Sequence, residues 1–348
     1  MDTYYTLFLY LLIPIITSLC ALGISNSNIK YENEICLRFL IFIVLFIPAS
    51  IRYGIGTDYF SYQDIYINNY YGGDFEPAFS LILFLCNKFN CSFNFFLSII
   101  SIVTLLPISF ILPQKGYFFY ILFYNITFTY LQTFNGIRQY AAISYLIIAC
   151  IKFMEKNKKQ YIFYSVVSVL FHYSSILPIL IIPLCVLKIG KKKSLFIIIL
   201  LILFLIKFDI IEIIGNFLTV IKIPYAKYFL EYSRIKGANS GLGLLLYAVI
   251  PFFLIIKNDG SRKGIILSNL SIIYICLIIL AGQLIFFSRM REAFVFVPIL
   301  GIGYYFRNTK RDIKSISFLI CLFSLLLTYI TTIIKTDNVT PYTSLFFN

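Results

Sequence analysis

Long apolar runs recur along the whole of this 348-residue chain, and they limit its fold more than any other feature. One of them reads SLFIIILLILFLI at residues 194–206. A helix needs about 20 such residues to cross a bilayer. Because lipid cannot satisfy open backbone groups, and because barrel strands would show alternating polarity, these runs predict a helical bundle. A mean hydropathy of +0.89 with only 13% charged residues is typical of the same class, an all-α polytopic membrane protein.

About twelve membrane spans can be placed on the sequence. They are centred in residues 4–24, 35–51, 93–112, 117–134, 137–153, 160–173, 175–188, 194–207, 242–256, 264–287, 290–306 and 314–334. We expect one integral membrane domain over residues 1–348, with outward-facing loops at 52–77 and 208–241. For the loops to alternate between the two sides of the membrane, residues 76–90 must enter the membrane without crossing it, as a re-entrant or interfacial helix.

The formal net charge of +14 could indicate a nucleic-acid partner, so its distribution along the chain decides what it means. Lys and Arg concentrate in short loops at residues 25–38, 113–116, 152–160, 188–193, 257–264 and 307–314. These loops alternate with less basic ones, as the positive-inside rule requires if they are cytoplasmic. The charge therefore indicates topology, and we expect no nucleic-acid partner. Both termini then face outward.

Arginine is over-represented in the segments that this topology places outside. Five of the nine arginines lie there, namely Arg52, Arg138, Arg234, Arg289 and Arg291. A planar guanidinium can bind phosphate through two parallel hydrogen bonds, which a lysine cannot do. The alternative for any single arginine is contact with lipid head groups. Polar neighbours such as Asn135 and Gln139, which flank Arg138, favour a binding site.

His172 is the only histidine in the chain and lies in the sequence LFHYSS at a predicted outward turn. A lone histidine is often a hydrogen-bonded packing residue, but an imidazole can also act as a general base. Asp58 and Asp64 could form a carboxylate pair, although their spacing means little outside a helix. Gly54 and Gly56 indicate a tight turn that could approach a ligand closely.

The eight cysteines show no metal-site spacing, so we expect neither a metal nor a cofactor.

Several short stretches, taken in order, resemble one family. They are RYGIGTDYFSYQDIY (52–66), FEPAF (75–79), FNGIRQYAA (134–142), FHYSS (171–175), SRMREAFVFVP (288–298) and VTPYTSLFF (339–347). This set is similar to the EpsG-like branch of the Wzy-type O-antigen and exopolysaccharide polymerases, from about residue 50 to the end of the chain. In SRMREAF the usual serine-tyrosine pattern after the first arginine is absent, so the resemblance carries over to Arg289 before Arg291.

The resemblance implies a fold related to the GT-C glycosyltransferases, in the bacterial cytoplasmic membrane, with an active site on its outer face. The implied activity joins oligosaccharide repeat units linked to undecaprenyl pyrophosphate, without a metal. A flippase and a chain-length regulator are implied partners. His172 would be the general base, with Asp58 as the alternative. The residues expected to bind the diphosphate are Arg52, Arg138, Arg289 and Arg291, supported by Gly54, Gly56, Asn135, Gln139 and Arg234.

Three other functions remain open. A flippase for lipid-linked oligosaccharides would need charges along its spans and usually an internal repeat, and neither is visible. A ligase that transfers finished glycan to another acceptor would share the chemistry of a polymerase. A membrane acyltransferase would need an acyl-donor site and typically more polar residues inside the bundle.

Overall fold

The computed structural model describes residues 3–25, 28–68, 75–207, 242–281, 285–306, 315–335 and 339–344. Within these ranges the chain forms helices and no strand, and the one isolated bridge joins Arg52 to Ser344. The prediction of an all-α protein is therefore confirmed. The predicted loop at 208–241 lies outside the described residues, as do residues 69–74 of the predicted loop at 52–77.

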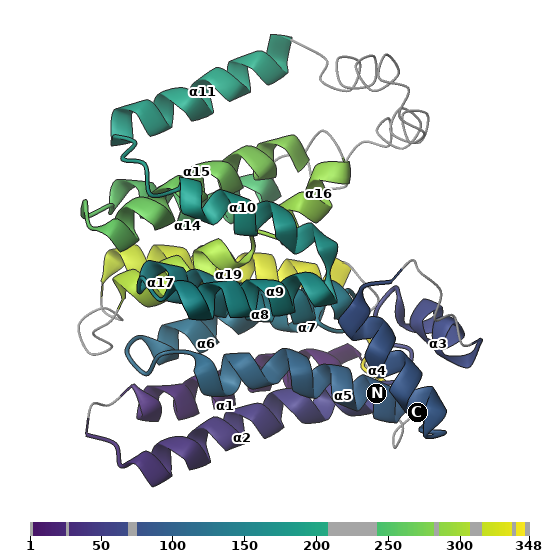
Figure 1. Ribbon diagram of the computed structural model, residues 1–348. Coiled ribbons are helices and arrows are strands. Elements are labelled where there is room, and N and C mark those ends of the chain that lie inside the picture. The colour runs from purple at the N-terminus through teal and green to yellow at the C-terminus, as the bar shows by residue number, and fades with distance from the viewer. Residues whose placement is uncertain are drawn as a thin grey trace, which may run out of the picture. The chain divides into compact units, whose positions relative to one another are not determined.

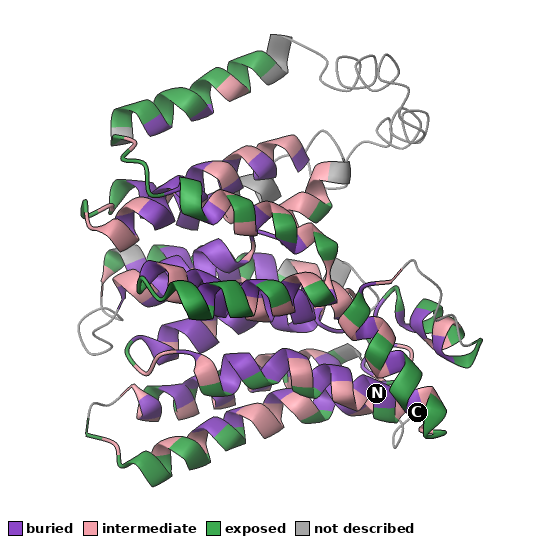
Figure 2. Cartoon of the chain, in the orientation of Figure 1, coloured by how far each residue is buried: buried purple, intermediate pink, exposed green. Residues whose placement is uncertain are grey.

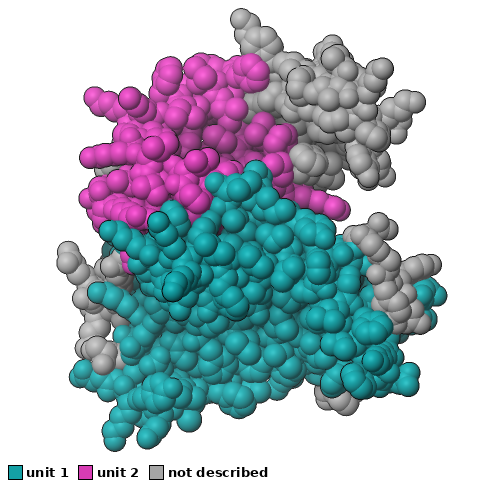
Figure 3. Space-filling view, viewed as in Figure 1, with its two compact units in different colours: residues 1–180, 302–348 teal, residues 181–301 magenta. Residues whose placement is uncertain are grey.

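The chain divides into two units, which Figure 3 colours separately. Unit 1 contains residues 1–180 and 302–348, and unit 2 contains residues 181–301. Each unit is described by itself.

Unit 1 is built mainly from the N-terminal half of the chain. Its helices are α1 (Thr3–Ile24), α2 (Tyr31–Ile51), α3 (Tyr59–Ile67), α4 (Pro77–Lys88), α5 (Phe93–Leu106), the π-helix η1 (Pro107–Ile111), α6 (Tyr117–Ile126), α7 (Thr129–Gln132), α8 (Ile137–Met154), α9 (Lys158–Phe171), the 3-10 helix η2 (Tyr173–Ser175) and α19 (Ile316–Lys335). Helices α10 (Ile176–Leu184) and α17 (Phe296–Tyr305) cross the boundary between the units.

Helix α8 lies in the interior of unit 1 and packs against α5 and α9, while α1 packs against α2 and α6. Most side chains of α8 are buried, as Figure 2 shows. The short helices α3 and α4 lie at one end of this bundle, beside the two termini (Figure 1). This end carries the candidate site.

The helix boundaries in unit 1 follow local sequence signals. Ser92 precedes α5 and its side chain accepts a hydrogen bond from the Phe95 N–H, and Asn157 caps α9 in the same way through Gln160. Helix α4 begins with Pro77, which suits the first helical position because its missing N–H would have no partner there. At its other end Asn90 has a φ of 51°, a left-handed C-terminal cap.

Five helices of the described chain are long and apolar enough to cross a membrane. They are Tyr4–Ile24, Tyr31–Ile51, Phe93–Ile111, Ile137–Met154 and Arg262–Ala281. The total of about twelve spans stays a prediction, and so does the GT-C-like arrangement. Helix α4 has 12 residues, or about 18 Å, against a hydrocarbon core of about 30 Å. It is too short to cross alone, and the non-crossing helix predicted at 76–90 stays a prediction.

Two predicted spans are interrupted in the structure. The span predicted at 117–134 is not one continuous helix, because α6 ends at Ile126 and Phe128 has a φ of 65° before α7 begins. The hydroxyl of Thr127 donates to the Phe123 carbonyl, which satisfies part of the freed helix end. The span predicted at 290–306 is likewise divided between two helices, because Ala293 to Val295 form a turn.

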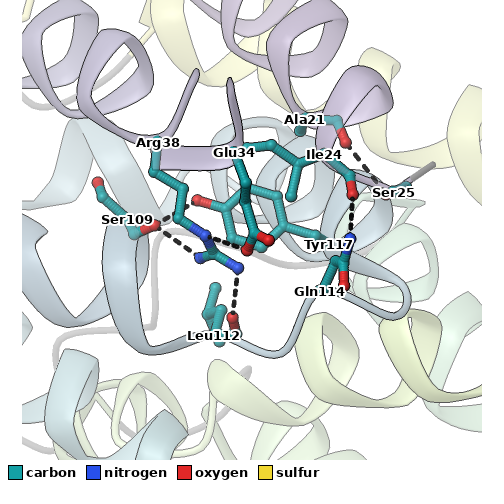
Figure 4. Close-up of polar contacts among 9 residues, drawn as sticks. All are labelled: Ala21, Ile24, Ser25, Glu34, Arg38, Ser109, Leu112, Gln114 and Tyr117. Atoms are coloured by element: carbon teal, nitrogen blue, oxygen red, sulfur yellow. Dashed lines mark hydrogen bonds and ion pairs between the residues drawn. The ribbon is translucent and has the colours of Figure 1, made fainter. Parts of the chain in front are cut away.

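Arg38, in the N-terminal half of α2, contacts the backbone around η1 (Figure 4). Its Nη1 and Nη2 donate to the carbonyls of Ser109 and Leu112, at 2.9 and 3.1 Å, and its Nε pairs with Glu34 at 2.8 Å. The guanidinium also lies over the Tyr117 ring. These contacts satisfy carbonyls around η1, where the α-helical hydrogen-bond pattern is lost.

Unit 2 contains four further described helices. They are α11 (Lys191–Lys207), α14 (Leu242–Ile256), α15 (Arg262–Ala281) and α16 (Ile285–Glu292). Helix α15 is largely buried and packs against the other three. Its Asn269 donates to the carbonyls of Cys185 and Leu187, at 2.8 and 2.6 Å, and so satisfies the backbone after α10.

Candidate active site

The segment after α2 forms a turn with two glycines, and this turn contacts the residues just before α8. Gly54 and Gly56 have φ values of +64° and +98°, a region that glycine adopts without strain. A Cβ built on Gly56 would lie 2.7 Å from the Phe134 carbonyl oxygen, so the backbones approach closely here. The side-chain oxygen of Asn135 accepts hydrogen bonds from Thr57 Oγ1 at 2.5 Å and from the Asp58 N–H at 3.1 Å. These hydrogen bonds attach the turn to Asn135, which is three residues before Arg138.

Arg52, which begins this turn, is buried and only 2% exposed. Its Nη1 donates to the Ala49 carbonyl, and its guanidinium lies over the Phe134 ring at 5.1 Å. Burial lowers its pKa to about 10, against the influence of neighbouring tyrosines, so it remains charged at neutral pH. Among the described residues no carboxylate pairs with it.

The tail segment 339–344 covers Arg52. The Tyr53 N–H donates to the Thr343 carbonyl at 3.0 Å, and the Tyr342 hydroxyl donates to the Pro48 carbonyl at 2.9 Å. The Tyr10 hydroxyl holds the start of the tail by donating to the Val339 carbonyl. Arg52 is therefore buried beside the tail segment, and its predicted role in diphosphate binding stays a prediction.

The main polar cluster of unit 1 is centred on Glu76, immediately before α4. Its carboxylate is buried, with 4% of the side chain exposed, and its two oxygens have different partners. Oε2 lies 2.6 Å from Arg138 Nη1, and Oε1 lies 2.6 Å from His172 Nδ1. The backbone N–H of Tyr173 also donates to Oε1 at 3.3 Å. One carboxylate thus joins two residues that the sequence predicted as separate site members.

Three helices bring these side chains together. Glu76 precedes α4, Arg138 is in the first turn of α8, and His172 terminates α9. Helix α9 packs against both α4 and α8. The Ser168 hydroxyl donates to the Ala142 carbonyl at 2.8 Å, which ties α9 to α8 one turn before the histidine. The cluster therefore rests on packed helices and not on a loop alone.

Aromatic side chains surround the Arg138 end of the cluster. The guanidinium lies 5.0 Å from the Phe75 ring centroid and 5.5 Å from that of Phe79. The Tyr62 hydroxyl interacts with the same guanidinium. These rings exclude water from one side of the ion pair, which strengthens the attraction between Arg138 and Glu76.

The carboxyl group of Glu76 is held in its ionised form. Burial alone would raise its pKa, but hydrogen bonding to His172 and to backbone N–H groups, with the charge of Arg138, outweighs burial and holds the pKa at about 2. The site therefore contains a fixed negative charge between a cation and an imidazole. An imidazole in this setting can accept a proton through the nitrogen that the carboxylate does not occupy.

The remaining predicted site residues lie in different surroundings. Asp58 is exposed just before α3, and Gln139 is half-buried on α8. Arg289 and Arg291 belong to α16 of unit 2, where Arg289 is exposed and Arg291 lies over the Tyr247 ring at 5.3 Å. Arg234 lies outside the described residues. Of the predicted residues, the structure brings Arg138 and His172 together through Glu76, and it brings Asp58 to Asn135.

Sequence reasoning missed Glu76 as a site residue. It was included only in the FEPAF stretch and at the start of a non-crossing helix, although it is a carboxylate beside proline at the start of an apolar helix. Acidic residues next to apolar helices are costly unless paired, and this signal could have singled it out. No group of three or more His, Cys, Asp or Glu side chains that could hold a metal ion is found in the described part of the chain.

Comparison with known proteins identifies a family. The family model described as the EpsG family matches residues 35–344, which is nearly the whole chain and includes every residue of the Glu76 cluster. No curated protein matches the chain. No solved structure matches it either.

Proposed function

Because the chain belongs to the EpsG family, we propose that it is a membrane polysaccharide polymerase that joins oligosaccharide repeat units carried on undecaprenyl pyrophosphate. The observation that carries the proposal is the Glu76 cluster, which places an imidazole and a guanidinium on one buried carboxylate. Lipid-linked transfer needs a proton acceptor and cationic groups near a diphosphate, and these groups supply that chemistry.

In the proposed reaction the acceptor is a sugar hydroxyl on one lipid-linked unit. Its oxygen forms a bond to the anomeric carbon of the donor glycan, and His172 takes the hydroxyl proton. The bond between that carbon and the donor diphosphate breaks, and undecaprenyl pyrophosphate leaves with the electron pair. Asp58, which is exposed near the start of α8, is the alternative base.

The leaving diphosphate needs positive charge. Arg138 already donates one Nη1 hydrogen bond to Glu76, so it would contact a phosphate with its remaining donors. Arg289 and Arg291 are the further candidates on α16. One well-placed donor to developing negative charge typically contributes about 3–4 kcal/mol to transition-state stabilisation.

The proposed location is the outer face of the bacterial cytoplasmic membrane. In unit 1 the segments predicted to face outward contact one another, as Arg52 with Ser344 and Glu76 with His172 do. On the side predicted to face inward, Gln114 of the segment 113–116 donates to the carbonyl of Ile24, the last residue of the first predicted span, at 3.1 Å (Figure 4). These contacts keep the segments predicted to face outward apart from those predicted to face inward, which supports the proposed topology. The distribution of basic residues indicates which side is cytoplasmic.

The experiment is reconstitution of the purified protein with labelled undecaprenyl-pyrophosphate-linked repeat units. A polymerase yields a ladder of lipid-linked products that differ by one repeat. A flippase would change only the sidedness of the label, and a ligase would need a second type of acceptor. Absence of a ladder, with active lipid-linked substrate present, would refute the proposal.

A further inference from the structure

The two oxygens of Glu76 are not interchangeable, because their partners have different hydrogen-bonding abilities. Arg138 carries only donors, so the oxygen at its side must always accept. His172 can present Nδ1 either as a donor, when the proton is on that atom, or as an acceptor, when it is on Nε2. An ionised carboxylate accepts only. The 2.6 Å contact between Oε1 and Nδ1 is therefore a hydrogen bond only if Nδ1 carries the proton.

We infer that Glu76 is a positioning residue that fixes the neutral His172 ring with its proton on Nδ1 and its lone pair on Nε2. In water a neutral histidine favours the opposite tautomer, with the proton on Nε2, so the protein imposes this state. The inference rests on the proposed function for its consequence, which is that Nε2 becomes the atom that receives the acceptor hydroxyl proton.

The surroundings of Glu76 hold its carboxylate in the required orientation. The Tyr173 N–H donates to the same oxygen as His172, and Arg138 donates to the other oxygen. Arg138 is in turn confined by the rings of Phe75 and Phe79. With 4% of the side chain exposed, little water can compete for either oxygen. Because the carboxyl stays ionised far below neutral pH, it does not become a donor to Nδ1 under physiological conditions.

The position of His172 in the chain supports the same orientation. It terminates α9 with an extended backbone, and its N–H donates to the Ser168 carbonyl at 3.0 Å. The Ser168 hydroxyl in turn donates a hydrogen bond to the Ala142 carbonyl of α8. Arg138 and His172 therefore approach the carboxylate from two helices that are tied together, which limits the ring to one set of contacts.

The absence of any other histidine makes the tautomer directly measurable. The protein is purified in detergent through a tag without histidine, after growth on histidine labelled with ¹⁵N in the ring. Its two ring nitrogens then give one pair of ¹⁵N resonances that distinguish a protonated from an unprotonated nitrogen. At pH 8 the wild-type protein is expected to have the proton on Nδ1. A proton on Nε2, or on both nitrogens, would overturn the inference. This measurement uses the wild-type protein, so it does not depend on whether any variant folds.

The variant Glu76→Gln tests whether the Glu76 carboxylate determines the tautomer of His172. The charged Arg138 donates at 2.6 Å, closer than the Tyr173 N–H at 3.3 Å, so we expect it to keep the amide oxygen on its side and to turn the amide NH₂ toward His172. That NH₂ donates to Nδ1, so the ring proton is expected to move to Nε2. The matched control is Glu34→Gln, because Glu34 is also a carboxylate paired with an arginine but lies in the first turn of α2, away from His172. The control should keep the wild-type resonances. A Glu76→Gln protein with the wild-type tautomer would contradict the inference.

Activity is measured in the same preparations with labelled lipid-linked repeats. With the proton on Nε2, that nitrogen has no lone pair to receive the acceptor proton, and kcat should fall by about 10²–10⁴-fold with little change in KM. Glu34→Gln should polymerise at the wild-type rate. A tautomer that shifts while polymerisation stays normal would support the positioning role and refute His172 as the base, so the two proposals fail in distinguishable ways.

Discussion

His172 Nδ1 lies 2.6 Å from Glu76 Oε1, although the two residues are 96 positions apart in the sequence. The other oxygen of the same carboxylate lies 2.6 Å from Arg138 Nη1, 62 positions away. This arrangement converts two separately predicted residues into one electrostatic unit. Any change at Glu76 must therefore affect both the arginine and the histidine.

Glu76 and Arg138 should be energetically coupled. Arg138→Ala leaves a buried carboxylate without its cation and should destabilise the protein by about 3–5 kcal/mol. The combination of Arg138→Ala with Glu76→Gln should cost less than the sum of the two single variants, since neither charge is then left alone. Denaturant unfolding of the four proteins in detergent measures the coupling. Strictly additive effects would show that the pair is not formed.

Acid should weaken unit 1 through Glu76. Its carboxyl has a pKa of about 2 in the folded protein and an ordinary value of 4.5, so the folded state favours the ionised form. This contribution to stability is fully present above pH 4.5 and is lost as the pH falls toward about 2. The difference in unfolding free energy between the wild type and Glu76→Gln should shrink over that window. A difference independent of pH between 4.5 and 2 would rule out the depressed pKa.

The two glycines of the turn offer a matched pair of substitutions. At Gly54 a Cβ would meet only the end of the Phe60 side chain at 3.4 Å, whereas at Gly56 it would lie 2.7 Å from the Phe134 carbonyl oxygen. Both positions have a positive φ, which costs an alanine about 1–2 kcal/mol. Gly56→Ala should cost more than this, because a backbone atom cannot rotate away. Thermal unfolding of both variants in detergent would show equal losses if the close approach to Phe134 were absent.

The two arginines of α16 should respond differently to substitution. Arg289 is exposed, whereas Arg291 is half-buried over the Tyr247 ring. If Arg289 binds diphosphate through two parallel hydrogen bonds, Arg289→Lys should lose about as much polymerisation as Arg289→Ala. Arg291→Lys, which keeps a cation near the ring, should mainly lower stability. Near-normal product from Arg289→Lys would mean that positive charge alone suffices.

The class of the protein could be predicted from the sequence because it depends on local composition. Apolar runs specify membrane helices wherever they occur, and the helices α1, α2, α5, α8 and α15 lie where such runs were placed. The interruption at Phe128 could not be predicted in this way. The break depends on a left-handed residue and a threonine hydroxyl, which composition alone does not specify.

The candidate site was predictable only in part, because burial and pairing depend on contacts distant in sequence. The contact of Arg52 and Tyr53 with a tail about 290 residues away was not visible in the sequence, and the role of Arg52 as a phosphate ligand stays a prediction. Glu76 was overlooked because its role exists only when α8 and α9 bring Arg138 and His172 to it. The types of residue were visible in the sequence, and their partners were not.

The most direct test is the polymerisation rate of His172→Gln beside that of the wild type, with purified protein and labelled lipid-linked repeats. Glutamine can replace a hydrogen bond of the imidazole but cannot take up the acceptor proton. The wild type should extend the substrate into a ladder, whereas His172→Gln should fold, bind the substrate and extend it about 10²–10⁴-fold more slowly. A full-length ladder from His172→Gln at the wild-type rate would contradict the proposed site.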